Sequence, residues 1–150
     1  MKNFILMAFL FCISLSLKAQ QTEKMENNQQ SKMAITKALE DNYFKGIYTG
    51  DINLLKQIFH PDTDLYGDVK GQPYAKTLAV YLDGVANRQS PKDCGKPFKG
   101  RIVSIDVVNS IAMVKARVQM YDFNYVDLLS FHQINGKWFI VNKMLSDVAE

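Results

Sequence analysis

The sequence is poor in the residues that build metal centres. It has two histidines and two cysteines among its 150 residues. His60 and His132 lie far apart in the chain, and no cluster of His, Cys, Asp and Glu has the spacing of a metal site. The glycine patterns of P-loop and Rossmann sites and the Gly-x-Ser-x-Gly motif of hydrolases are also missing. We therefore expect no metal and no cofactor, and hydrolysis or nucleotide transfer finds no support.

A concentrated charge of one sign is likewise absent. The chain has 18 Lys and Arg residues against 15 Asp and Glu residues, which gives a formal net charge of +3 at pH 7. Cleavage after residue 19 would remove Lys2 and Lys18 but no acidic residue, so the net charge would fall further. Electrostatic capture of nucleic acid needs a concentrated basic face. The sequence therefore predicts no nucleic-acid partner.

No apolar run is long enough for a comfortable membrane span. The run Phe4–Leu17 follows the basic residue Lys2 and ends near the small residue Ala19, as in a cleaved secretory signal. An uncleaved anchor is the alternative. We expect residues 1–19 to form a signal peptide. The mature protein would then be exported, to the periplasm or as a secreted protein, with no membrane association after cleavage.

The rest of the chain is expected to form one domain. Residues 20–30 are polar and lack an apolar period, which predicts a short disordered leader. Residues 31–150 have the length and composition of a single globular domain. Cys94 is the one cysteine outside the predicted signal, so an internal disulfide is excluded. An inert thiol, a reactive thiol and an intermolecular bridge stay open as its role.

Two helices are predicted in the first half of this domain. The first follows Ser31, the expected N-cap, and ends at Gly50. Its apolar stripe consists of Ile35, Ala38, Leu39, Tyr43 and Ile47. Asp51 is the expected N-cap of a second, shorter helix, which Pro61 stops just beyond His60.

A short strand and a third helix follow. The strand is expected around Asp64–Tyr66, with turn residues at Lys70-Gly71. The helix is expected from about Thr77 to Arg88. Gly84 lies inside this helix and costs it about 1 kcal/mol relative to alanine. We therefore expect another group to approach the backbone closely at that glycine.

Four strands are predicted in the last third of the chain. They are rich in β-branched and aromatic residues and are separated by short turns, of which Asn135-Gly136 is a strong hairpin signal. The predicted strands are Arg101–Val108, Ile111–Met120, Phe123–Ile134 and Lys137–Leu145. Sequential strands with tight turns form an antiparallel meander, and the upstream helices are available to cover it.

The alternation of apolar residues indicates which face of each strand is buried. In Ile111–Met120 the even positions are all apolar, and in Arg101–Val108 the odd positions from Val103 to Val107 are apolar. Lys137–Leu145 is apolar on both faces, which predicts cover by helices on one face and by a loop or a second subunit on the other. Because a twisted sheet curls around its helices, we expect an α+β cone whose mouth admits a small ligand.

The element order and several segments resemble the NTF2-like superfamily, and within it the SnoaL-like group named putative lumazine-binding proteins. The resembling segments are Tyr43–Asp51, Phe59–Asp62, Leu65–Gly67, Tyr81–Arg88, Ser90-Pro91 and Asn135–Lys143. The resemblance spans nearly all of residues 31–148 and implies a cystatin-like cone, in which a curved antiparallel sheet wraps around three N-terminal helices. The superfamily includes isomerases and dehydratases, and its sheet faces often pair two subunits, which implies a homodimer. The group's name implies a bicyclic, pteridine-like ligand.

Asp127 is the leading candidate for chemistry. It shares a strand face with Tyr125 and Leu129. If that face lines the cone, desolvation would make the carboxylate a better proton acceptor. The alternatives are that this face is solvated, or that Asp127 pairs with a lysine such as Lys143 on the neighbouring strand. A lysine partner would count against catalysis.

Other polar residues are candidates for ligand contacts. His60 could act as an acid or base, or it could place a positive charge at a helix C-terminus. Tyrosines could stack on a flat ligand and hydrogen-bond its edge, or they could simply fill the core. The predicted ligand-binding residues are Tyr43, His60, Tyr66, Tyr81, Asp127 and Asn142. No position matches a catalytic motif of the superfamily closely enough to inherit a role.

Three hypotheses for function follow, and the sequence favours the first. The chain could be an exported cone that binds a small aromatic or apolar molecule without a reaction. It could instead be a proton-transfer enzyme, an isomerase or dehydratase, with Asp127 or His60 as the base and Tyr66 or Tyr81 as the donor to an oxyanion. It could also be a dimeric structural or interaction module whose cone is filled by its own side chains.

Overall fold

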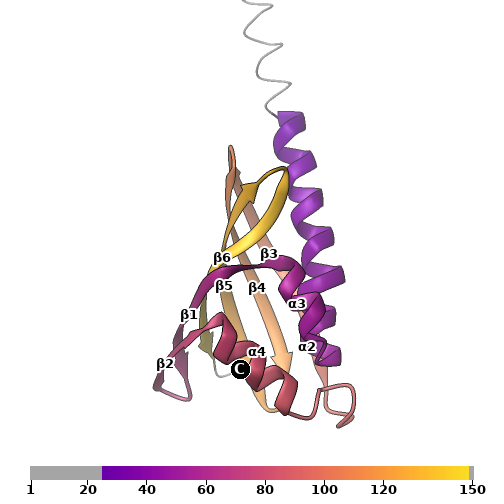
Figure 1. Ribbon diagram of the computed structural model, residues 1–150, viewed down its shortest axis with the longest axis vertical. Coiled ribbons are helices and arrows are strands. Elements are labelled where there is room, and N and C mark those ends of the chain that lie inside the picture. Colours follow the sequence, from indigo (N-terminus) through magenta and orange to yellow (C-terminus); the bar gives the residue numbers. More distant parts are fainter. Residues whose placement is uncertain (1–24, 149–150) are drawn as a thin grey trace, which may run out of the picture.

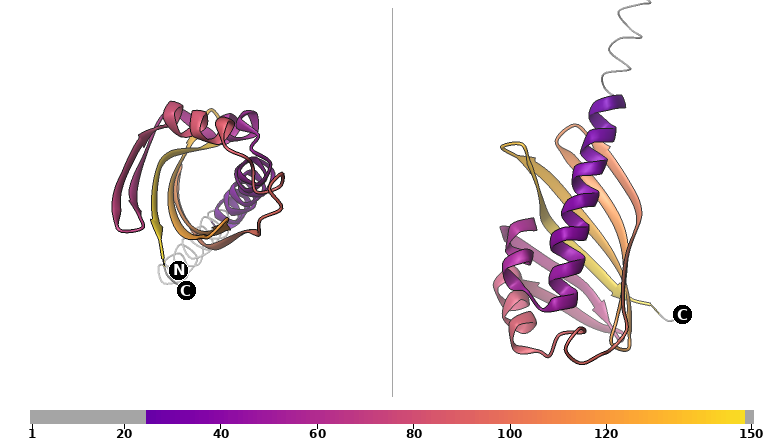
Figure 2. Two further views of the ribbon diagram at one scale, coloured as in Figure 1. Left: turned by 90° about the horizontal axis from the view of Figure 1, so that it is seen from below. Right: turned by 90° about the vertical axis from the view of Figure 1, so that its right-hand side faces the viewer.

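The computed structural model describes residues 25–148, in which a six-stranded sheet curls around a set of helices (Figure 1). The predicted signal peptide and residues 20–24 lie outside the described residues. Seen end-on, the sheet and the helices are arranged together in a ring (Figure 2). The predicted α+β cone, with a curved sheet wrapped around helices, is confirmed.

The first helical segment is longer than predicted and contains a π-helical turn. Residues 25–38 are α-helical, so residues 25–30, predicted as part of a disordered leader, belong to this helix. The π segment η1 (Leu39–Phe44) and helix α2 (Lys45–Thr49) continue it. Its fully buried residues, Ile35, Leu39, Tyr43 and Ile47, are spaced by four. A four-residue spacing drifts around an α-helix of 3.6 residues per turn, and the π turn corrects this drift by taking up an extra residue.

Helix α3 (Ile52–Ile58) begins as predicted and ends earlier. The Oδ1 atom of Asp51 accepts hydrogen bonds from the N–H groups of Asn53 at 2.8 Å and Leu54 at 3.3 Å, which confirms the predicted N-cap. The chain then enters strand β1 (Phe59–Val69), because Phe59 pairs with Ile140 in the sheet. The prediction that this helix reaches His60 is therefore wrong.

A β-hairpin replaces the short strand that was predicted. Strand β1 turns at Lys70 and Gly71 into strand β2 (Gln72–Thr77). Helix α4 (Leu78–Asn87) follows, and Thr77 Oγ1 accepts a hydrogen bond from the Val80 N–H at 3.4 Å. A Cβ atom built on Gly84 of this helix would meet no heavy atom within 4 Å. The predicted close approach at Gly84 is wrong, and the glycine instead borders open space.

The meander of four long strands is confirmed. Its strands are β3 (Phe98–Val108), β4 (Ile111–Met120), β5 (Phe123–Ile134) and β6 (Lys137–Asp147). The sheet order is β2-β1-β6-β5-β4-β3, and the β1–β6 pair is parallel while the other pairs are antiparallel. The sheet is therefore mixed at one junction. The even positions of β4 are all buried, as predicted.

Two irregularities change which side chains point inward. A register shift between Ile102 and Ser104 of β3 leaves Val103 44% exposed, so its predicted burial is wrong. In β6, Val141 is an extra residue, because Ser130 pairs with Asn142 whereas Phe131 pairs with Ile140. This β-bulge interrupts the alternation of the strand, as bulges do.

The bulge explains why β6 reads as apolar on both faces. Before it, Trp138 and Ile140 are buried; after it, Lys143 and Leu145 are buried, and Met144 is 51% exposed. The two-faced apolar pattern therefore comes from a phase change along one strand. Strict alternation from Trp138 and Ile140 would place Asn142 and Met144 on the inner face of β6. Because of the bulge, Lys143 and Leu145 lie there instead.

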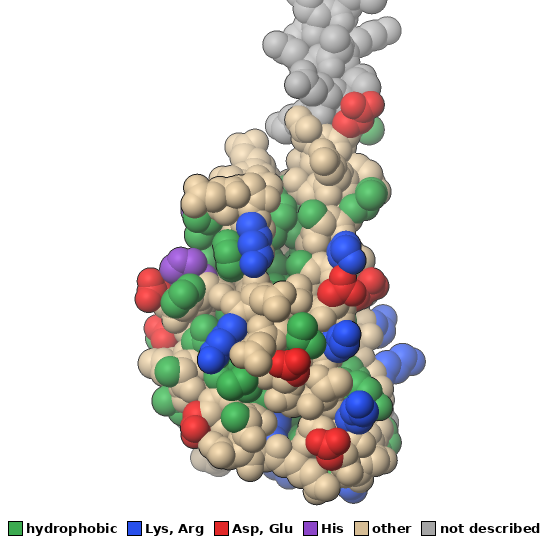
Figure 3. Space-filling view, turned by 45° about the vertical axis from the view of Figure 1, so that its right-hand side comes forward, with side chains coloured by type: hydrophobic (Ala, Val, Ile, Leu, Met, Phe, Trp, Pro, Cys, Tyr) green, Lys and Arg blue, Asp and Glu red, His purple; other side chains and the backbone are tan. Residues whose placement is uncertain are grey.

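The outer surface mixes charges of both signs. On the face shown in Figure 3, Lys and Arg side chains are interspersed with Asp and Glu side chains. Among residues 25–148, no helix combines the length and apolar character that crossing a membrane would require.

Candidate functional site

Three polar side chains meet inside the cone. Asp127 comes from β5 and Lys143 from β6, where they are diagonal neighbours, because Asp127 pairs with Leu145 and Lys143 pairs with Leu129. Tyr43 reaches them from the π segment of the first helix. Asp127 and Tyr43 are 0% exposed and Lys143 is 5% exposed. Burial of two charged groups at one place indicates a site or a structural ion pair.

The three groups form a closed set of contacts. The Lys143 ammonium donates a hydrogen bond to Tyr43 Oη at 2.6 Å, and the Tyr43 hydroxyl donates to Asp127 Oδ2 at 2.7 Å. The Lys143 Nζ atom also lies 3.1 Å from Asp127 Oδ1, as an ion pair. This last contact lacks the geometry of a hydrogen bond, so Oδ1 is a buried carboxylate oxygen without a hydrogen-bond donor. Of the alternatives left open for Asp127, the structure shows an interior position and the pairing with Lys143, and the solvated face is wrong.

The surroundings of Tyr43 keep its hydroxyl neutral. Burial, together with the negative charge of Asp127, raises the pKa of Tyr43 well above its ordinary value. The hydroxyl therefore stays protonated and acts as a donor to the carboxylate. The Lys143 Nζ atom lies 5.2 Å from the ring centroid of Tyr43 and 5.8 Å from that of Tyr81. Aromatic faces at these distances attract a cation.

A cavity of about 250 Å³ opens beside this network. Asp127 and Lys143 lie at its buried end. The tyrosines 74, 81 and 125 line it, as do Lys76 and Arg88, and apolar residues such as Val118 complete the wall. Gly84 also borders the cavity, which accounts for the open space beside it. The cone is thus hollow at this place and is not filled by its own side chains.

The tyrosines of the cavity are neutral hydrogen-bonding groups. Burial is the main cause in each case: it raises the pKa of Tyr125 to about 12, and it raises the pKa values of Tyr81 and Tyr74 above the ordinary range. Phenols that stay protonated at neutral pH can donate to a ligand oxygen. The cavity therefore combines aromatic walls with hydroxyl donors.

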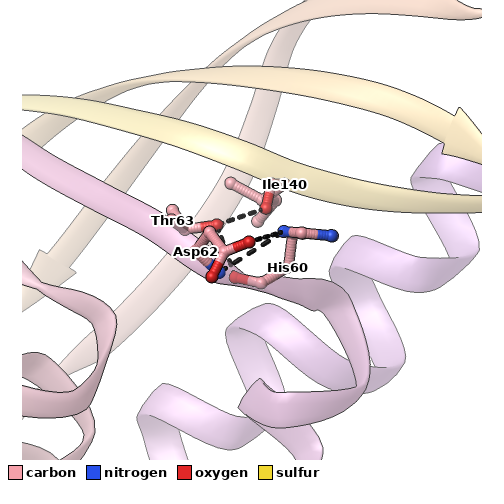
Figure 4. Close-up of polar contacts among 4 residues, drawn as sticks. All are labelled: His60, Asp62, Thr63 and Ile140. Atoms are coloured by element: carbon pink, nitrogen blue, oxygen red, sulfur yellow. Dashed lines mark hydrogen bonds and ion pairs between the residues drawn. The ribbon is translucent and has the colours of Figure 1, made fainter.

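The structure places His60 outside this cavity. The imidazole Nδ1 atom accepts a hydrogen bond from the Asp62 N–H at 3.3 Å, and Thr63 Oγ1 lies 2.7 Å from the carbonyl oxygens of both His60 and Ile140 (Figure 4). These contacts hold the irregular first part of β1 against β6. His60 does not cap a helix C-terminus as predicted, because α3 ends at Ile58.

Tyr66 and Asn142 also lie apart from the cavity lining. Tyr66 is 48% exposed, and its hydroxyl donates a hydrogen bond to Asp64 Oδ2 at 3.4 Å. The Asn142 side-chain amide donates to the Asp64 carbonyl oxygen at 3.2 Å and so joins β6 to β1. Of the six predicted ligand-binding residues, Tyr81 and Asp127 line the cavity. Tyr43 is not part of the lining, but it is hydrogen-bonded to Asp127.

Several lining residues were missed from the sequence. Tyr74 and Lys76 lie on β2, a strand that was not predicted. Tyr125 could have been found, since it lies two residues from Asp127 on the same strand face. Arg88 follows the last turn of α4, and no feature of the sequence marks it as a cavity residue. Among the described residues, no group of three or more His, Cys, Asp and Glu side chains could hold a metal ion.

Comparisons with known proteins identify a family and a curated relative. A family model described as "Putative lumazine-binding" matches residues 30–146. The curated protein "Aldolase FrzH" from a Cladobotryum species is 32% identical over 104 residues, which cover 68% of this chain and 80% of that relative.

Two solved structures of NTF2-like proteins resemble the fold. The protein from Shewanella baltica has a TM-score of 0.71 at 22% identity and covers 81% of this chain and 96% of its own. The protein from Silicibacter pomeroyi has a TM-score of 0.72 at 21% identity and covers 80% of this chain and 98% of its own. Since the family match spans most of the chain, this protein belongs to the putative lumazine-binding family and has the NTF2-like fold.

Proposed function

We propose that the protein binds a small carbonyl or hydroxyl compound in the cone cavity. The observation that carries this proposal is the fully buried Asp127 Oδ1 atom, which has no hydrogen-bond donor and lies beside the Lys143 ammonium at the buried end of the cavity. A buried polar atom that lacks a hydrogen bond costs about 1–3 kcal/mol, and Oδ1 has an ion pair with Lys143 but no hydrogen bond. A ligand hydroxyl that donates to Oδ1 would remove this cost.

The size and walls of the cavity define the rest of the ligand. Its volume of about 250 Å³ is below the range of roughly 300–1,000 Å³ that is usual for drug-sized ligands. A molecule of about one ring therefore fits it. Tyr74, Tyr81 and Tyr125 offer aromatic surface for that ring and hydroxyl groups for its edge.

Calorimetric titration with two matched probes tests this binding mode. Acetophenone offers only a carbonyl acceptor, whereas α-hydroxyacetophenone adds a hydroxyl donor beside it. We expect the hydroxyketone to bind about tenfold more tightly, as a hydrogen bond to a charged group warrants. The Asp127→Asn variant should lose this preference, and Tyr66→Phe on the exposed face should keep it. Equal affinities for the wild type would overturn the proposed role of Oδ1.

A second candidate function is aldol-type catalysis, which the curated relative named as an aldolase favours. Asp127 would take a proton from the carbon next to the ligand carbonyl. The C–H electron pair would form a C=C bond, and the carbonyl π pair would move to oxygen beside the Lys143 ammonium. The enolate oxygen pair would then re-form the first C=O bond while the C=C pair bonds to a second carbonyl carbon. The π pair of that second carbonyl would move to its oxygen, which would receive the proton from Asp127. The Lys143 partner of Asp127 favours binding, so the choice needs a direct measurement.

Hydrogen exchange at carbon separates catalysis from binding. Phenylacetone in D₂O loses its α-proton NMR signals as they exchange for deuterium. A catalytic site should speed this loss, and Asp127→Asn should slow it at least ~100-fold, the lower end of the contribution of a general base. If the wild type leaves the exchange rate unchanged while still binding the ketone, catalysis is excluded and binding is what remains.

We also propose that the chain is exported and pairs with a second copy through the outer face of its sheet. Support for pairing comes from one row of exposed apolar side chains across three strands, Leu128, Met144 and Tyr66, which are 40%, 51% and 48% exposed. Light scattering should report a dimer that Leu128→Asp combined with Met144→Asp converts to a monomer. N-terminal sequencing of secreted protein tests cleavage after residue 19.

A further inference from the structure

The charges that line the cavity do not balance. Asp127 and Lys143 oppose each other at the buried end. Lys76 and Arg88 add two positive charges nearer the surface, where Lys76 is exposed and Arg88 is half-buried. Within residues 25–148, neither of these two has an acidic group at salt-bridge distance. The cavity lining therefore carries two positive charges that the acidic side chains of residues 25–148 do not compensate.

Aromatic rings hold both cations in place. The Lys76 Nζ atom lies 5.1 Å from the ring centroid of Tyr74, and the Arg88 guanidinium carbon lies 5.8 Å from that of Tyr121. Contacts with ring faces leave the N–H donors of these groups free for an anion. The charge of Arg88 also opposes the burial-driven rise in the pKa values of Tyr81 and Tyr125, so its field reaches the cavity tyrosines.

We infer that the ligand is a small carboxylic acid, with its carboxylate at Arg88 and Lys76 and its carbonyl or hydroxyl group at Asp127 and Lys143. The inference rests on the proposed binding function and names the ligand class: oxo or hydroxy acids with an apolar or aromatic body. The guanidinium fork matches a carboxylate, and one negative charge suffices to balance the half-buried Arg88. The two ends of the cavity thus recognise two different groups of one molecule.

Two ketones that differ only at the acid group test the inference. Phenylpyruvate carries a carboxylate where phenylacetone carries a methyl group. In calorimetric titrations of the full-length protein at low salt, we expect phenylpyruvate to bind about tenfold more tightly. Added salt should reduce this preference, because partly exposed charges are screened.

Charge-removing variants locate the effect. Arg88→Gln and Lys76→Gln should each lower the affinity for phenylpyruvate and leave that for phenylacetone unchanged, with Arg88 having the larger effect because it is more buried. Lys115→Gln is the matched control, since Lys115 is exposed and lies outside the cavity lining. It should alter neither affinity.

The outcomes distinguish this inference from the function on which it rests. If the wild type binds both ketones equally, or if Arg88→Gln and Lys76→Gln preserve the preference for phenylpyruvate, the carboxylate end is refuted and the binding function stands. If neither ketone binds, both proposals are refuted.

Discussion

The Tyr43 oxygen joins the other two members of the buried network. It accepts a hydrogen bond from Lys143 and donates one to Asp127, so it links the cation and the anion through a neutral group. The direct Lys143–Asp127 contact is an ion pair without hydrogen-bond geometry. Such a network stabilises the fold only while all three members are present, because each would otherwise leave a buried polar group unpaired.

A double-mutant cycle tests this dependence. Lys143→Met and Asp127→Leu should each lower the free energy of unfolding by about 3–5 kcal/mol, since each leaves an uncompensated buried charge. The double variant should lose less than the sum of the two, because no charge then remains. Urea denaturation measures all four proteins. Additive losses would mean that the two charges do not interact in the folded protein.

At this scale the sequence was informative about Asp127 and less so about its surroundings. Alternation along Phe123–Ile134 predicts Asp127 on the apolar face. Because β5 alternates regularly around Asp127, the prediction is confirmed. Lys143 could be named as a partner, but its inward orientation depends on a bulge. Arg88 and Lys76 gave no sign of their position, because a surface lysine and a lysine at a cavity rim look the same in a sequence.

At the scale of elements, Gly67 pairs β1 with β6 in a backbone conformation, φ 155°, that residues with a side chain rarely adopt. A Cβ atom built there would lie 1.7 Å from the Leu145 carbonyl oxygen, which is a direct clash with backbone. Gly67 pairs with Leu145 in the parallel register that joins the hairpin to the meander. The absence of a side chain at this position is therefore a condition for the mixed sheet.

Two glycine substitutions should change stability in opposite directions. Gly67→Ala should lower the free energy of unfolding by about 3 kcal/mol, because the strands would have to separate locally. Gly84→Ala should raise it by about 0.5–1 kcal/mol, because alanine favours the helix and the site is open. Thermal unfolding of the two variants and the wild type measures both. Destabilisation by Gly84→Ala would contradict the open space beside α4.

Elements with strong local signals could be predicted, and those set by pairing could not. Turns such as Asn135-Gly136 delimit the long strands, and the side chain of Asp51 caps its helix, so both kinds of boundary follow from local chemistry. Strand β2 is short and contains Pro73, and it forms because β1 is available as a partner. Helix α3 ends earlier than predicted for the same reason, because Phe59 pairs with β6.

For the whole molecule, the buried tyrosine hydroxyls of the cone make the free energy of unfolding fall at alkaline pH. Burial raises the pKa of Tyr125 to about 12 and that of Tyr43 well above its ordinary value. In the unfolded chain these groups ionise near pH ~10. The folded state then holds protons that the unfolded state has released, so stability is complete below that pH and falls above it.

Urea denaturation across this range should follow that sign. We expect the midpoint to stay level up to about pH 9 and to fall steadily between about pH 10 and 12. Tyr43→Phe removes one of the shifted groups and should make the fall shallower. A midpoint that is independent of pH up to 12 would mean that these phenols ionise equally in both states.

The extra residue at Val141 decides what kind of interior this architecture has. If it were moved to the end of β6, Asn142 and Met144 would turn inward, and Lys143 would face solvent. Asp127 would then meet a thioether instead of an ammonium group. The amino-acid composition would be identical, yet the buried end of the cavity would lose the Lys143 ammonium group. Insertions and deletions near this point, more than exchanges of one side chain for another, therefore separate a polar chamber from a filled core within one architecture.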